Sequence, residues 1–164
     1  MNILNLKRIF RTIDSTWFIL VIGLAGVILF QALPGSRPLD DSYITYRYAR
    51  NINTGAGFVY NNAEHVQGTS TPLYTLVLAL FSLPLGIDKI PYISFGIALI
   101  ADVINTVLLF RIARHLLKQN FAAFVLSIVF LLQPLRINVA QGGMETSLFI
   151  TLLLAMYDRY LIGQ

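Results

Sequence analysis

Residues 39–51 read Leu-Asp-Asp-Ser-Tyr-Ile-Thr-Tyr-Arg-Tyr-Ala-Arg-Asn, and this stretch is where acids and bases crowd together in the chain. It follows a long apolar run and precedes a turn at Gly55 and Gly57. Two adjacent acids followed by arginines at helical spacing predict a helix with an acidic N-terminus. An aspartate at the N-cap accepts a backbone N–H bond and suits the positive end of the helix dipole. Capping therefore accounts for one acid but not for both.

The composition of the whole chain indicates an integral membrane protein. Of the 164 residues, 56% are hydrophobic and 12% are charged, and the apolar residues form several uninterrupted runs, which is unusual for a soluble domain of this size. The net charge of +4 is spread along the chain, which argues against nucleic acid as a partner. The chain has no cysteine, so thiol catalysis, disulfides and cysteine-based metal sites are excluded.

Four apolar segments are predicted to span the membrane, namely residues 16–33, 91–112, 121–135 and 144–161. A further helix, over residues 73–85 and started by Thr71 and Pro72, is shorter than the ~20 residues that a span needs. Basic residues favour the cytoplasmic side of a membrane. Keeping residues 73–85 on the outer face places Arg111, Arg114 and Lys118 in the cytoplasm, whereas a crossing there would place them outside.

The predicted fold is therefore an all-α, polytopic membrane helix bundle with about four spanning helices and interfacial helices in its first outer loop. Residues 1–33 form the cytoplasmic N-terminus and the first span, residues 34–90 the outer loop, and residues 91–164 three further spans. This topology places five titratable residues on one extracytoplasmic face: Asp40, Asp41, Glu64, His65 and Glu145.

Two interpretations of the outer-face residues stay open on residue types alone. A helix that starts with two acids and carries Arg47 and Arg50, with His65 nearby and Glu145 in a second loop, could bind a phosphate and deprotonate a hydroxyl group. Arginine offers paired donors to phosphate oxygens, and a nearby carboxylate can act as a general base. Capping acids and arginines that reach the headgroup region explain the same residues without a ligand.

Asp102 and Asn105 lie three residues apart in the predicted span 91–112. A carboxylate within the hydrocarbon layer is costly and must face the helix bundle. The pair forms either a clasp between helices, which is the commoner use of such polar pairs, or part of a substrate path. A transporter or channel component would draw its support from these two residues.

Four motifs resemble the outer loops of the GT-C superfamily of membrane glycosyltransferases, in particular its arabinofuranosyltransferase-like members. Three belong to the first outer loop: Asp-Asp-x-Tyr-Ile-x-x-Arg-Tyr-Ala-Arg-Asn at 40–51, Gly-x-Gly-Phe-Val-Tyr-Asn at 55–61, and Glu-x-Val-x-Gly-x-x-x-Pro-Leu at 64–73. The fourth, Gly-Gly-Met-Glu-Thr-Ser-Leu at 142–148, resembles the second outer loop of that group.

The resemblance implies an enzyme that transfers a sugar from a polyprenyl-phosphate donor to a hydroxyl of a glycan, lipid or protein acceptor at the extracytoplasmic face of the cell membrane. It places the general base at Asp40, with Asp41 as its neighbour or substitute. Arg47, Arg50 and His65 are the candidates for binding the donor phosphate, and Glu145 is a possible contact from the second loop. No cofactor and no metal ligand is implied, and a need for a divalent metal stays open.

Members of this superfamily usually continue with further spans. The resemblance therefore predicts that the 164-residue chain is the N-terminal part of such a glycosyltransferase and is inactive by itself. The alternative is a non-catalytic integral membrane subunit or scaffold, although a scaffold would have no need of acids in both outer loops.

Overall fold

The computed structural model describes residues 21, 25–26, 28–29, 32–62, 66 and 68–162. Over these residues the protein is helical and contains no strand, which confirms the predicted all-α class. The predicted first span, residues 16–33, lies largely outside the described residues. The helices are α3 (Asp40–Asn53), α4 (Pro72–Leu85), the 3-10 helix η1 (Ile87–Lys89), α5 (Ile90–Leu117), α6 (Asn120–Leu131), α7 (Pro134–Gln141) and α8 (Thr146–Ile162).

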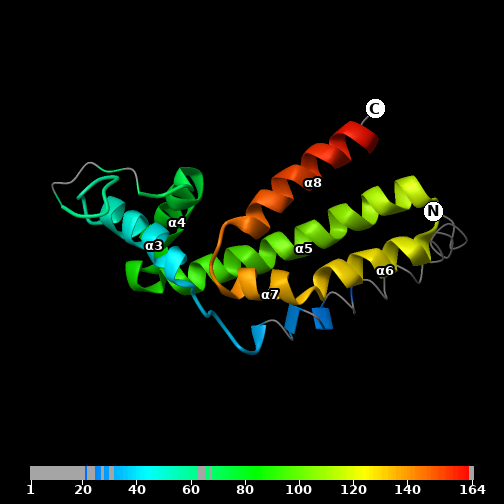
Figure 1. Ribbon diagram of the computed structural model, residues 1–164, viewed down its shortest axis with the longest axis horizontal. Helices are drawn as coiled ribbons and strands as arrows, with labels where there is room; N and C mark the ends of the chain where they lie inside the picture. Colours follow the sequence, from blue (N-terminus) through cyan, green and yellow to red (C-terminus); the bar gives the residue numbers. More distant parts are fainter. Residues whose placement is uncertain are drawn as a thin grey trace, which may run out of the picture.

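Helix α5 is the long axis of the molecule (Figure 1). Its 28 residues correspond to a length of about 42 Å. Helices α6 and α8 pack along α5, and the short α7 lies against both α5 and α8. Helices α3 and α4 pack against each other at the N-terminal end of α5, where α4 also contacts α5. The predicted outer loop is thus a separate helical layer at one end of the bundle.

Helix α4 begins where the sequence predicts. Thr71 is its N-cap residue and Pro72 its first helical residue, and the carbonyl of Thr71 accepts a hydrogen bond from the amide of Thr75 at 3.0 Å. The fixed φ of proline suits the first helical position, where the missing N–H costs nothing. The helix ends before Gly86, whose φ of 108° lies in a region that residues with a Cβ rarely adopt.

The segment predicted to span the membrane at 121–135 is bent and is not one straight helix. Helix α6 ends at Leu131, α7 begins at Pro134, and the two helices are bent by 51°. Pro134 disfavours a helical backbone at the residue before it and lacks an N–H for the preceding turn. Gln133 accordingly has an extended backbone with ψ of 120°, so the chain turns at this point.

Among the described residues, one segment is long and apolar enough to cross a membrane. It covers Ile87–Leu117, has a mean hydropathy of 2.1 over its most apolar part, and is 44% buried there. The bent pair of α6 and α7 meets the same conditions if it crosses as one unit, and α4 is apolar but shorter. The structure supports membrane association through these helices, and the four-span arrangement stays a prediction.

Candidate functional site

The two acids begin α3 but do not cap it. Leu39 is the N-cap residue, no side chain caps the helix, and Asp40 and Asp41 are its first two helical residues. The prediction that one aspartate is the N-cap is therefore wrong. The helix starts instead through a backbone bond of 3.0 Å from the Ser42 amide to the Leu39 carbonyl. Both carboxylates are exposed, suit the positive end of the helix dipole, and make no hydrogen bond or ion pair with a described residue.

The segment before α3 is held by the loop that joins α7 to α8. The amide of Arg37 donates to the Gln141 carbonyl at 2.9 Å, and the amide of Leu39 donates to the Gly142 carbonyl at 3.0 Å. The Ser42 hydroxyl also donates to the Gly142 carbonyl. The structure thus brings the acidic start of α3 and the second predicted loop, which lie about 100 residues apart in sequence, into direct contact.

Gly143 in this loop packs against two buried tyrosines. Its φ is +77°, and a Cβ at this position would lie 1.7 Å from the Tyr46 hydroxyl. The Tyr46 hydroxyl is 2.6 Å from the Ser94 hydroxyl, and Tyr74 donates to the Gly143 carbonyl at 3.4 Å. Burial raises the pKa of both phenols, and the negative charge of Glu145 contributes to the rise in the pKa of Tyr74. The loop that precedes α8 therefore packs on this tyrosine pair through Gly143.

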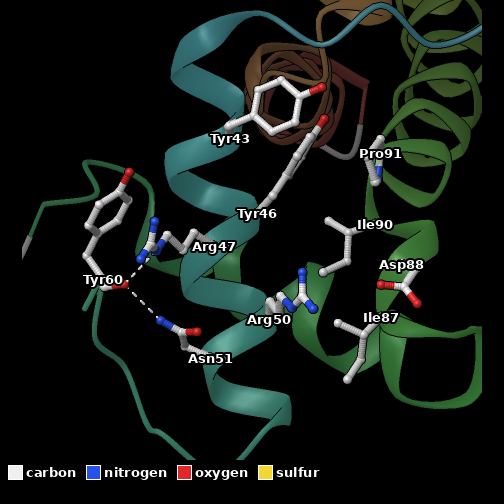
Figure 2. Close-up of a pocket in the computed structure, with 10 residues that line it drawn as sticks. All are labelled: Tyr43, Tyr46, Arg47, Arg50, Asn51, Tyr60, Ile87, Asp88, Ile90 and Pro91. Carbon is white, nitrogen blue, oxygen red and sulfur yellow. Dashed lines mark hydrogen bonds between the residues drawn. The ribbon is translucent and has the colours of Figure 1, made fainter. Parts of the chain in front are cut away.

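A cavity of about 540 Å³ lies between α3 and the corner formed by η1 and the start of α5 (Figure 2). Tyrosines, isoleucines, two arginines and one carboxylate line it together: Tyr43, Tyr46, Arg47, Arg50, Asn51, Tyr60, Ile87, Asp88, Ile90 and Pro91. Both arginines that the sequence singles out thus belong to one pocket. We call it the α3–η1 pocket.

Arg47 is tied to the loop that follows α3. Its Nε donates to the Tyr60 carbonyl at 2.8 Å, its Nη2 donates to the Asn61 side chain at 2.9 Å, and its guanidinium lies 4.5 Å from the Tyr60 ring centre. Asn51 supports the same loop by donating to the Tyr60 carbonyl at 3.0 Å. Arg47 therefore has a structural contact that the sequence does not reveal.

Arg50 and Asp88 are the unpaired charges of the α3–η1 pocket. Arg50 projects from α3 toward Ile87, Asp88 and Ile90 (Figure 2). Within the described ranges, neither Arg50 nor Asp88 makes a hydrogen bond or an ion pair. Sequence reasoning missed Asp88. The signal that could have found it is its position, since it is a single acid between two apolar helices, just before the start of α5.

Asp40 does not line the pocket, but it continues the same face of α3. Residues 40, 43 and 47 are spaced at i, i+3 and i+7, so their side chains follow one face of the helix. The seven residues from Asp40 to Arg47 correspond to about 10 Å along the helix axis. Tyr43, whose side chain is 54% exposed, lies between them. Asp41 points away from this face by about a quarter of a turn.

The interpretation of Asp102 and Asn105 as a clasp between helices is confirmed. Arg136 of α7 donates through Nη1 to a carboxylate oxygen of Asp102, and its guanidinium lies 4.5 Å from the Phe130 ring centre. Asn105 donates to the carbonyl of Ser147 in α8 at 3.0 Å. These contacts join α5 to α7 and α8 and are buried.

Glu64 and His65 lie outside the described residues, so the structure does not place the predicted histidine contact to the phosphate. Among the residues that are described, no group of three His, Asp or Glu side chains is arranged to hold a metal ion. Comparisons with protein-family models, with curated proteins and with solved structures find no match for this chain. The motif resemblance stays a prediction.

Proposed function

We propose that the chain is a membrane glycosyltransferase, or the N-terminal part of one, that transfers a sugar from polyprenyl phosphate to an acceptor hydroxyl on the extracytoplasmic face. One observation carries the proposal. A single face of α3 aligns the free carboxylate of Asp40 with the arginine-lined α3–η1 pocket, while the loop that contains Glu145 packs against the start of that helix.

The chemistry assigns a separate task to each end of this face. Asp40 accepts the proton of the acceptor hydroxyl as its oxygen attacks the anomeric carbon of the sugar. The bond from that carbon to the phosphate oxygen breaks, and the lipid phosphate leaves with the electron pair. An arginine stabilises the leaving anion through paired N–H donors. Along α3, Asp40 lies about 10 Å from Arg47 and about 15 Å from Arg50, which leaves room for a sugar ring beside Tyr43.

The exposed apolar side chains support a membrane location with several helices in the bilayer. Leu80 of α4 is 64% exposed, Phe121 of α6 is 77% exposed, and Phe149 of α8 is 58% exposed. Apolar surface of this extent on several helices marks contact with lipid or with a partner, because each Å² removed from water contributes about 25 cal/mol.

The replacement Asp40→Asn tests the proposed base. Asparagine keeps the size of the side chain and removes its basicity, so sugar transfer should fall by ~10²–10⁴ at normal membrane abundance. The loss of charge at the helix start should cost only ~0.3–1 kcal/mol of stability. The assay follows transfer from a radiolabelled polyprenyl-phosphate sugar in membranes that contain the full protein.

The neighbouring replacement Asp41→Asn is the matched control, since it removes the same charge one residue away. Full activity in Asp40→Asn together with loss in Asp41→Asn would move the base to Asp41. Full activity in both variants would refute the assignment of the base. That result would favour the non-catalytic subunit, for which the tie of Arg47 to the Tyr60 loop already provides a ligand-free role.

A further inference from the structure

We propose that Asp88 determines the specificity of the α3–η1 pocket, where it accepts hydrogen bonds from the hydroxyl groups of a glycosyl phosphate whose phosphate binds Arg50. The inference deepens the proposed function and rests on it. It concerns a residue that no sequence motif singles out.

Opposite charges line the α3–η1 pocket from two different elements. Arg50 comes from α3 and Asp88 from η1, and both line the same cavity of about 540 Å³. They make no ion pair with each other, so their charged atoms are more than the contact distance of 4.0 Å apart. Figure 2 shows the Arg50 side chain extending from α3 toward Ile87 and Ile90, with Asp88 on the opposite wall of the pocket. A ligand can therefore contact the two groups at once.

The two arginines of the pocket differ in their contacts. Arg47 uses Nε and Nη2 to hold Tyr60 and Asn61, whereas the guanidinium of Arg50 makes no hydrogen bond to any described residue. All five of its N–H donors are available, and a guanidinium matches phosphate oxygens with paired donors. Phosphate binding in this pocket therefore falls mainly to Arg50, and Arg47 is a positioning residue for the Tyr60 wall.

The opposite charges of Arg50 and Asp88 fix the orientation of a ligand in the pocket. A carboxylate repels a phosphate but accepts hydrogen bonds from hydroxyl groups, because an ionised aspartate has acceptors only. A ligand that satisfies both groups carries an anion at one end and hydroxyl groups within a few ångströms of it. A glycosyl phosphate has this arrangement. Tyr43, Tyr60 and the two isoleucines supply flat and apolar walls for the sugar ring.

Binding measurements on the full protein in phosphatidylcholine nanodiscs test the inference. Three probes are compared: undecaprenyl phosphate, mannosyl-phosphoryl undecaprenol and soluble mannose 1-phosphate. Arg50→Gln should weaken the two lipid probes by about tenfold or more, since a hydrogen-bonded charge is lost. Asp88→Asn should weaken the mannosylated lipid by about tenfold while undecaprenyl phosphate binds as before or more tightly, because a repelling charge is removed.

The matched control is Lys89→Gln, which removes a charge from the same 3-10 helix at a residue that does not line the pocket. Its affinities should stay within about twofold of the parent for all probes. Unchanged thermal unfolding of each variant shows that the pocket variants are folded. If mannose 1-phosphate binds as tightly as the mannosylated lipid and is weakened equally by Asp88→Asn, the result supports a site for a glycosyl phosphate. The natural ligand is then a soluble sugar phosphate and not a lipid.

Two results would overturn the inference. One is an equal loss of affinity for both lipid probes in Asp88→Asn, which would mean that Asp88 does not contact the sugar. The other is unchanged phosphate binding in Arg50→Gln. Sugar transfer by Asp40→Asn tests the proposed function separately. If Asp40→Asn keeps full transfer while Arg50→Gln and Asp88→Asn change binding as expected, only the assignment of the base is wrong. If Asp40→Asn loses transfer while the two pocket variants do not change binding as expected, only the inference about the pocket is wrong.

Discussion

The charges at the junction of α5 with α7 are buried and paired, whereas those at the α3 end of the molecule are exposed and form no ion pair within the described residues. Asp102 and Arg136 are 0% and 5% exposed and form an ion pair. Asp40, Arg50 and Asp88 are exposed and have no described partner. A charge removed from water needs a partner because its desolvation is costly, while an exposed charge loses little by standing alone. The α3 end therefore holds the charges that a ligand can use.

The buried cluster is held together but not fully satisfied. One carboxylate oxygen of Asp102 and Nη2 of Arg136 have no hydrogen-bond partner in the described part of the chain, and neither do the Asn105 side-chain oxygen and the Ser147 hydroxyl. An unsatisfied buried polar atom costs about 1–3 kcal/mol. The cluster therefore orients α7 and α8 on α5 at some cost in stability. Replacing its residues tests how the buried charges hold these three helices together.

The largest expected effect comes from breaking the buried ion pair on one side. Asp102→Leu leaves the Arg136 charge buried without its partner and should lower the free energy of unfolding by about 3–5 kcal/mol. Arg136→Met should cost a similar amount for the same reason. The double variant should recover most of the loss, because both charges are then gone. Unfolding in detergent, followed by circular dichroism, measures all three; a double variant as unstable as the sum of the single ones would contradict the pairing.

The next effect tests the contact between the second loop and α3. Gly143→Ala places a Cβ into the Tyr46 hydroxyl at a backbone conformation that alanine disfavours, so it should cost roughly 2–4 kcal/mol. The matched control is Gly96→Ala in α5, where nothing lies within 4 Å of the added carbon. That control should be neutral or stabilising by up to ~1 kcal/mol. Equal unfolding free energies for the two variants would mean that the loop does not pack on Tyr46.

The smallest effect concerns Tyr46 at alkaline pH. Burial raises the pKa of its phenol above the ordinary value of 10.0, so the folded protein holds this proton more tightly than the unfolded chain does. The stability that results is complete below about pH 10 and is lost as the pH rises above it. Above pH 10, Tyr46→Phe should therefore lose less stability than the parent protein. Some loss should remain in the variant, because burial also raises the pKa of Tyr74.

At neutral pH the same variant should lose about 1 kcal/mol, the contribution of its hydrogen bond to Ser94. Tyr92→Phe is the control, since Tyr92 is 70% exposed, and it should change the neutral-pH stability by less than ~0.5 kcal/mol. Unfolding midpoints of the parent and Tyr46→Phe across the pH range decide the question. Parallel pH profiles for these two proteins would show that Tyr46 does not hold its proton more tightly when folded.

Sequence alone predicted the elements that local rules control. The all-α class follows from the apolar runs, and α4 begins at Pro72 because proline suits a first helical residue. Helix α5 covers the second predicted span, residues 91–112, and extends beyond it to Leu117. The aspartates were expected at the start of α3, and they lie there. Their role as a cap was wrong: Leu39 is the N-cap residue, and its amide donates to the Gly142 carbonyl of a distant loop.

Within the candidate site, sequence placed Asp40, Arg47 and Arg50 on one helix by their spacing, since helical spacing is a local property. The tertiary structure decided which of these groups are free: the loop at Tyr60 engages Arg47, and the turn into α5 brings Asp88 opposite Arg50. It also decided that Asp102 meets Arg136 and that the Gly142 loop packs on α3. These contacts join residues from 13 to 100 positions apart, and no local pattern carries information about such distant partners.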